Sequence, residues 1–228
     1  LDNTIALHQD RLDKLYKLKK GFLQFMFPED DKAMYPRLRF ADFSEDWEQR
    51  KLGEISTSYS GGTPTVNRAE YYKGSLPFIR SGEINKNKTE LYITEKGLSN
   101  SSAKMVNIGD ILYALYGATS GEVGISSING AINQAILVIK PKDNYNSQFI
   151  TQYLMMQKQK IISKYLQGGQ GNLSGSILKK LTIMLPEYQE QNKYALFLKK
   201  LDTTIALHQI KIKKIQQIKK AYLQKMFI

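Results

Sequence analysis

The chain begins Leu1-Asp2-Asn3-Thr4-Ile5-Ala6-Leu7-His8-Gln9, and nearly the same segment returns 200 residues later as Leu201-Asp202-Thr203-Thr204-Ile205-Ala206-Leu207-His208-Gln209. Across residues 1–28 and 201–228 the two copies are identical at 15 of 28 positions. Such a repeat indicates that one structural unit is used twice. We therefore expect two equivalent elements that flank a different, inserted segment.

Both copies carry apolar side chains every three or four residues, as an amphipathic helix with one narrow apolar stripe does. The stripes alone are also compatible with two surface helices packed on a domain. The length of the first copy and the lysines on its outer face favour a coiled-coil pair instead. The predicted seam of this pair consists of Ile5, His8, Leu12, Leu15, Phe22, Ile205, His208, Ile212, Ile215 and Tyr222.

The connection between the copies favours an antiparallel pair. A parallel pair would require the chain to travel back along the whole first helix, roughly 40 Å at 1.5 Å per residue. In the antiparallel pair we expect Phe27 to lie near Leu201, with Leu1 and Ile228 meeting at the other end.

The only two histidines, His8 and His208, occupy the same position of the repeat. In the antiparallel pair just described they would lie toward opposite ends, too far apart to share a zinc ion held at roughly 2 Å from each nitrogen. We therefore predict no metal site and interpret both histidines as polar seam residues that help to fix the register.

The segment between the copies has the pattern of an α+β domain. Ser147 is expected to cap a helix that the glycines of residues 168–171 end. Short strands, separated by Gly-rich and Ser-rich turns such as residues 60–64, are predicted at 76–80, 110–116, 122–125, 131–139 and 181–185. The predicted fold is thus a mainly β domain with helices, residues 29–186, attached to a long antiparallel two-helix coiled coil formed by residues 1–28 and 187–228.

The composition indicates a polyanionic partner. Lysine and arginine number 33 against 21 acidic residues, a net charge of +12, of which residues 49–186 contribute +8 and residues 187–228 contribute +6. Nucleic acids and membranes both attract such a chain. A helix lying on a membrane would need a broader apolar face than the final helix has, and no apolar run is long enough to cross one. The lysines of the final helix fit a solvated face that also adds nonspecific attraction to DNA phosphates.

The sequence lacks cysteines and the common nucleotide-binding and catalytic motifs, which disfavours several other classes of protein. There is no cysteine, so neither a disulfide framework nor a thiolate zinc site is available, which fits an intracellular protein. No phosphate-binding loop, dinucleotide fingerprint or adenine-methyltransferase tetrapeptide occurs, and the acidic residues of the insert are scattered singly. Because the chain has no initiator methionine and begins within a helical pattern, we expect it to be a fragment of a longer protein.

An ordered set of short motifs runs through the chain. Its members are Ser60-Gly61-Gly62-Thr63-Pro64, Leu76-Pro77-Phe78-Ile79-Arg80-Ser81-Gly82-Glu83-Ile84, Ile93-Thr94-Glu95-Lys96-Gly97-Leu98, Ser101-Ser102-Ala103-Lys104, Asn133-Gln134, Leu178-Lys179-Lys180-Leu181 and Leu185-Pro186. Followed by the final helix, this set resembles the target-recognition domains of type I restriction-modification specificity subunits. The resemblance covers essentially the whole chain and rests on the ordered set rather than on any single piece.

The resemblance implies a non-catalytic cytoplasmic protein that recognises double-stranded DNA. An intact subunit of that family has two target-recognition domains, and this chain corresponds to the second of them with the two spacer helices. It would direct a complex to one half of a bipartite target. The expected partners are modification subunits, which use S-adenosylmethionine, and restriction subunits, which use ATP; cofactors, magnesium included, belong to these partners and not to this chain.

The insert is expected to read DNA from one face built by its loops, because specificity needs side chains that reach base edges. The candidates are Thr63, Arg80, Ser81, Lys86, Lys88, Ser120, Gln167, Gln170 and Asn172. The rival hypothesis is a coiled-coil module whose insert binds protein. Two oligomeric states are compatible with the sequence. In a monomer the two helices of one chain bury each other's apolar stripes, whereas a homodimer would restore the two-domain outline of the family.

Overall fold

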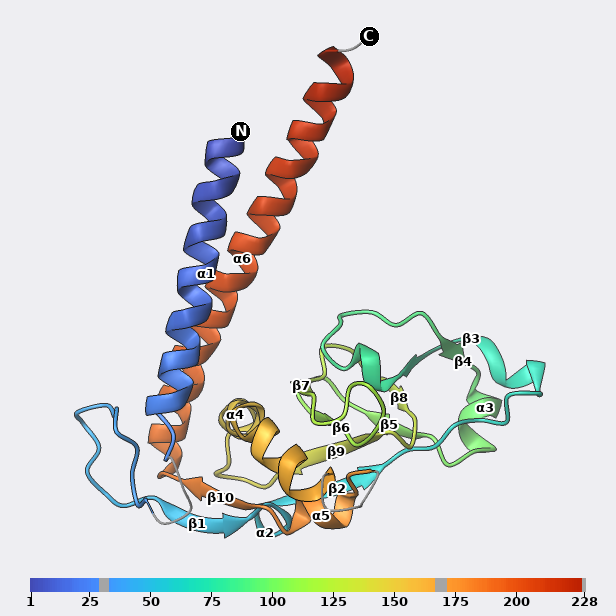
Figure 1. The fold of residues 1–228 in the computed structure, drawn as a ribbon. Coiled ribbons are helices and arrows are strands. Elements are labelled where there is room, and N and C mark those ends of the chain that lie inside the picture. The colour runs from blue at the N-terminus through green and yellow to red at the C-terminus, as the bar shows by residue number, and fades with distance from the viewer. Residues whose placement is uncertain (29–32, 167–171, 227–228) are drawn as a thin grey trace.

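The computed structural model describes residues 1–28, 33–166 and 172–226. Figure 1 shows two parts, a long arm of two helices and an α+β domain at one end of the arm. The start of the first helix and the end of the last helix lie toward the far end of the arm. Among the described residues, no helix combines the length and the apolar character that crossing a membrane requires.

The arm consists of α1 (Asp2–Phe25) and α6 (Tyr188–Met226), which run antiparallel (Figure 1). Lys19 Nζ lies 2.5 Å from Asp202 Oδ1, and Lys219 pairs with Asp2 nearer the far end. Between the helices a small apolar cluster is formed by Leu12, Ile205 and Ile212, with Ile5, Leu15 and Leu201 packed against it. The predicted antiparallel two-helix coiled coil is therefore confirmed.

The register of the two helices differs from the expected one. Phe27 packs against Tyr194, with ring centroids 6.0 Å apart, and not against Leu201. One turn earlier, Phe22 meets Phe197 edge-on at 4.8 Å. The expectation for Phe27 was wrong because α6 begins before the repeat, and its first turns already belong to the helix pair.

This register brings the two histidines together. His8 Nδ1 lies 3.4 Å from His208 Nδ1, so the prediction that they lie toward opposite ends was wrong. Equivalent residues of two antiparallel copies meet only at a local twofold axis, so the arm has approximate twofold symmetry about this pair. Within the described part of the chain, no group of three or more His, Cys, Asp or Glu side chains is placed to hold a metal ion.

The other predicted seam residues fall into two groups. His8 is buried, and His208, Ile215 and Phe22 are half-buried, as a seam position requires. Tyr222 is 62% exposed, so its assignment to the seam was wrong. The reason is that Asp2, at the start of α1, already pairs with Lys219, and α6 continues past that point (Figure 1).

The described part of the domain contains two four-stranded sheets and one two-stranded sheet. The first is ordered β2 (Ser56–Ser60), β9 (Ile136–Pro141), β6 (Ile111–Ala114) and β7 (Val123–Ile125). The second is ordered β4 (Tyr92–Ile93), β3 (Tyr72–Ile79), β8 (Gly130–Ile132) and β5 (Lys104–Val106). The pair is β1 (Glu48–Lys51) with β10 (Thr182–Leu185). Neighbouring strands are antiparallel except β3 and β8, which are parallel.

Helices connect and cover these sheets. They are α2 (Leu52–Ile55), α3 (Glu95–Ser99), α4 (Ser147–Leu166) and α5 (Gly175–Lys179), with 3-10 turns η1 (Ala69–Tyr71) and η2 (Ser81–Glu83). The α+β class is as predicted. The run 131–139 is not one strand, because Asn133 turns the chain from β8 into β9 by accepting a hydrogen bond from the Ala135 N–H. Asn146, not Ser147, caps α4, since its Oδ1 accepts from the Phe149 N–H at 3.0 Å.

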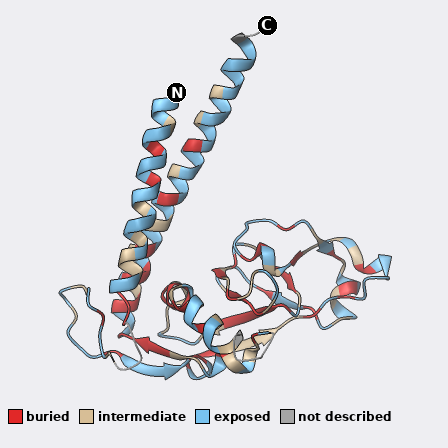
Figure 2. Ribbon diagram, in the orientation of Figure 1, coloured by how far each residue is buried: buried red, intermediate tan, exposed pale blue. Residues whose placement is uncertain are grey.

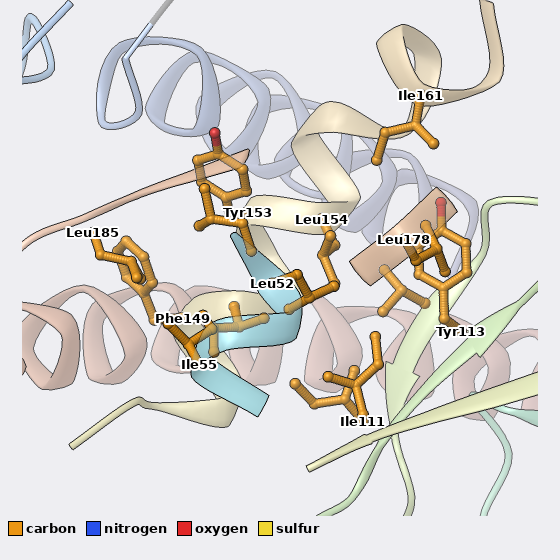
Figure 3. Packing of buried hydrophobic residues seen from close by; sticks show 14 of the residues in the cluster. Leu52, Ile55, Ile111, Tyr113, Phe149, Tyr153, Leu154, Ile161, Leu178 and Leu185 are labelled. Atoms are coloured by element: carbon orange, nitrogen blue, oxygen red, sulfur yellow. The ribbon is translucent and has the colours of Figure 1, made fainter. Parts of the chain in front are cut away.

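An aromatic cluster joins the arm to the domain. Phe27, which follows α1, lies with its ring centroid 5.4 to 6.3 Å from those of Trp47, Phe149 and Tyr194, and all four side chains are at most 1% exposed. The same core continues through α2, α4 and the strands, whose apolar side chains point toward one another in Figure 3. Figure 2 shows the contrast with the arm, which is largely exposed beyond this junction.

We predict that Phe27→Ala destabilises the protein by about 3–5 kcal/mol, since it removes a fully buried aromatic ring and leaves a cavity. The matched control is Phe25→Ala, two residues earlier, where the ring is 40% exposed and the expected loss is below about 1 kcal/mol. Chemical denaturation followed by circular dichroism measures both. Equal losses in the two variants would contradict the anchoring role of Phe27.

The histidine pair predicts a loss of stability on acidification. Burial lowers the pKa of His8, and the charges of Lys211, His208 and Arg11 lower it further. Because the unfolded chain then binds the proton more readily than the folded one, stability falls as the pH drops below the ordinary histidine value of about 6.5. Unfolding at pH 7.5 and 5.5 should show this loss, and His8→Asn should reduce it. An unchanged pH dependence in that variant would refute the assignment.

Candidate nucleic-acid interface

A glycine turn after β2 brings Thr63 to the end of β8. The Gly62 N–H donates to the carbonyl oxygen of Ile132 at 3.3 Å, and Thr63 Oγ1 donates to Gln134 Oε1 at 2.7 Å. A Cβ at Gly61 would lie 2.0 Å from the Ile132 carbonyl oxygen, which is closer than any real contact. Glycine is therefore needed here for the close approach of two backbone segments.

Thr63 and Arg80 line one groove of about 620 Å³ beside β3 and β4. Its walls include Tyr72 and Tyr92, and Val66 at its edge is 76% exposed. The structure thus brings together two of the candidate residues from distant positions in the chain. An open groove with aromatic walls and a polar rim offers both apolar and hydrogen-bonding contacts to a ligand.

Arg80 is engaged within the protein. Its guanidinium donates to Glu83 at 2.9 Å and to Glu90 at 2.8 Å, and these hydrogen bonds raise its pKa. A guanidinium that already neutralises two carboxylates contributes little net charge to a phosphate or base. The geometry therefore gives Arg80 a role in holding its own loop together.

Glu83 is the centre of this arrangement and is only 4% exposed. Burial alone would raise the pKa of its carboxyl group, but hydrogen bonds from Arg80, Thr89 and the backbone of Glu90 lower it to about 2. The carboxylate is consequently ionised throughout the physiological pH range, so it can pair with the Arg80 guanidinium.

The loop beyond this ion pair carries the next candidates. Lys86 and Lys88 are exposed, and their side chains form no hydrogen bond or ion pair with the described residues. Ser81, in η2, is half-buried. The two lysines are therefore available to an external anion.

The remaining candidates lie elsewhere. Ser120 is half-buried and donates to the Leu115 carbonyl oxygen at 3.1 Å, in a loop that packs against α4 through the Glu122–Lys158 ion pair. Asn172 is exposed, whereas Gln167 and Gln170 lie outside the described residues. Ser120 thus belongs to the β6–β7 loop of the other sheet, not to the groove that Thr63 and Arg80 share.

The sequence reasoning missed two residues that organise this surface. Gln134 fixes Thr63, and Glu83 fixes the loop that follows Arg80. A signal for Glu83 was present, since an acidic side chain three residues after the start of a turn is the spacing of a capping box. For Gln134 the pairing depends on a contact between residues 71 positions apart, which no local pattern reveals.

Comparison with known proteins identifies the family. The family model described as the type I restriction modification DNA specificity domain matches residues 44–217. The chain belongs to this family. Its relatives include the type I restriction enzyme MjaIX specificity subunit of Methanocaldococcus jannaschii, 31% identical over 71% of this chain and 39% of the relative. The EcoR124I/EcoR124II specificity subunit of Escherichia coli is 26% identical over 89% of this chain and 50% of the relative.

Solved structures show the same fold. The HsdS subunit from Thermoanaerobacter tengcongensis superposes with a TM-score of 0.68 at 18% identity, over 98% of this chain and 53% of that one. The S subunit of a type I restriction-modification system from M. genitalium gives a TM-score of 0.66 at 16% identity, over 98% and 58%. The specificity domain described here thus spans about half the length, or less, of the curated relatives it matches.

We predict that Gly61→Ala destabilises the specificity domain by about 1–3 kcal/mol, because the added methyl group collides with the backbone of Ile132. Gly82→Ala is the matched control, since a Cβ there meets no described atom within 4 Å. Chemical denaturation of the two variants provides the measurement. A Gly61→Ala protein as stable as Gly82→Ala would show that the close approach is not required.

Proposed function

We propose that this chain is a sequence-specific DNA-recognition element that directs a type I restriction-modification complex to one half of a bipartite target. The observation that carries the proposal is the specificity-domain match over residues 44–217 together with the fold shared with HsdS. The exposed lysines of the 84–88 loop and the net charge of the domain add the electrostatic attraction that any DNA-binding surface needs.

The proposal includes a division of labour. Residues 29–186 recognise DNA, and residues 1–28 and 187–228 form the spacer to which other subunits attach. The chain itself is non-catalytic and acts in the cytoplasm. Modification subunits supply the S-adenosylmethionine-dependent methylation, and restriction subunits use ATP and magnesium. The relatives support this assignment, since they are named as specificity subunits.

A second copy of the chain is also part of the proposal. The arm is approximately twofold symmetric about His8 and His208, and within the described residues the domain lies at one of its ends. At the other end the side chains of Tyr222 and Leu223 are exposed. A homodimer meeting there would present two domains that read the same half-site twice in inverted orientation.

The test is a salt titration of DNA binding, with and without the modification subunit. We predict that log K falls linearly with log salt, with a slope of about −0.9 for each phosphate contacted, because neutralised phosphates release counterions that salt recaptures. The two lysines of the 84–88 loop should account for part of that slope. Weak binding with a flat salt response in both preparations would instead favour a coiled-coil module that binds protein.

A further inference from the structure

The loop between η2 and β4 is closed at its base by one carboxylate. Glu83 accepts hydrogen bonds from the Arg80 N–H at 3.1 Å, from the Arg80 guanidinium at 2.9 Å and from the Glu90 N–H at 3.2 Å. The hydroxyl of Thr89 lies 2.9 Å from Glu83 Oε2. Both ends of the loop are thus tied to the same buried side chain.

The middle of the loop is also held in place. The Lys86 N–H donates to the Glu83 carbonyl oxygen at 2.8 Å, and Ser127 Oγ donates to the Lys86 carbonyl oxygen at 3.1 Å. Asn85 packs directly on the backbone of Gly124, where a Cβ would lie 2.0 Å from Asn85 Oδ1. Contacts with η2, with β7 and with the turn after β7 therefore hold the loop in place.

This fixed loop presents three consecutive polar side chains, those of Lys86, Asn87 and Lys88. All three are exposed, and within the described residues none of them forms a hydrogen bond or an ion pair. An ordinary surface turn does not need a buried carboxylate, which is costly to desolvate unless several donors surround it. Rigid presentation of free polar groups lowers the entropy cost of binding, as a recognition element requires.

The chemistry of these three side chains fits duplex DNA. The amide of asparagine matches the N6 and N7 edge of adenine in the major groove with two hydrogen bonds. Lysines on either side are suited to phosphates, which position the protein without reading sequence. Arg80, the more obvious candidate for base contact, is occupied by Glu83 and Glu90 at the base of the same loop.

We propose that Asn87 reads an adenine in the target half-site, that Lys86 and Lys88 hold the flanking phosphates, and that Glu83 is the positioning residue that presets the loop. The inference rests on the proposed function and goes further by naming the base, the reading residue and the residue that orients it. It assigns the reading of a base to Asn87 instead of Arg80. Asn87 is not among the candidates predicted from the sequence.

The test uses the full chain assembled with its modification subunit and duplexes that carry each single-base change of the half-site. Asn87→Ala should lose roughly tenfold or more in discrimination at one A·T pair and keep its preference elsewhere. Lys88→Ala should weaken binding to all duplexes equally and reduce the salt slope by about one. Asn107→Ala, at an exposed position outside the loop, is the matched control and should change neither quantity.

The positioning role of Glu83 is tested by measuring base discrimination in a separate variant. Glu83→Gln should lose discrimination at the same A·T pair as Asn87→Ala, and combining the two changes should add nothing further. A merely structural role would weaken recognition at every position. Thr89→Val, which removes one contact to the carboxylate, is a milder variant with the same expected pattern if Glu83→Gln fails to fold.

Two negative outcomes are distinguishable. If wild type discriminates among the duplexes and Asn87→Ala discriminates equally well at every position, the role of Asn87 is wrong and the proposed function stands. If the assembled wild-type complex shows no base preference at all, the proposed function itself fails.

Discussion

Phe27 is buried between Trp47, Phe149 and Tyr194, and these contacts join the arm to the domain. They fix the end of α1 against the start of α6 and against α4 at the same time. Edge-to-face aromatic packing has preferred geometries, so a cluster of four rings tolerates little sliding of one helix along the other. The register of the arm, including the meeting of His8 with His208, follows from this junction.

The junction also determines how the domain is attached to the arm. Because the aromatic cluster is continuous with the core around Leu52 and Ile55, the sheets are attached to the arm through buried apolar contacts. The ion pair of the half-buried Arg39 with the buried Glu190 adds a second connection, between α6 and the segment after α1. A surface attached in this way keeps a constant orientation relative to the arm, which the proposed reading of a bipartite target with fixed spacing would require.

The repeat was sufficient to predict two long helices and their antiparallel pairing, because the stripes through Leu12 and Ile212 are strong local signals. The register was not predictable in the same way, since it is decided by contacts such as Phe22 with Phe197 that lie far apart in the sequence. Short strands such as β4 and β5 were missed because two or three residues carry no periodicity. The ion pair of Arg80 with Glu90, ten residues on, was also not predictable, because nothing local shows it, and a contact of Arg80 with DNA stays a prediction.

Sequence-specific DNA recognition by this domain is our proposal. Its most direct test is selection from a pool of randomised duplexes by the chain assembled with its modification subunit, followed by sequencing of the bound fraction. We predict that one short half-site, containing at least one invariant A·T pair, is enriched over successive rounds. A bound fraction whose sequences stay random, although DNA is retained, would contradict the claim.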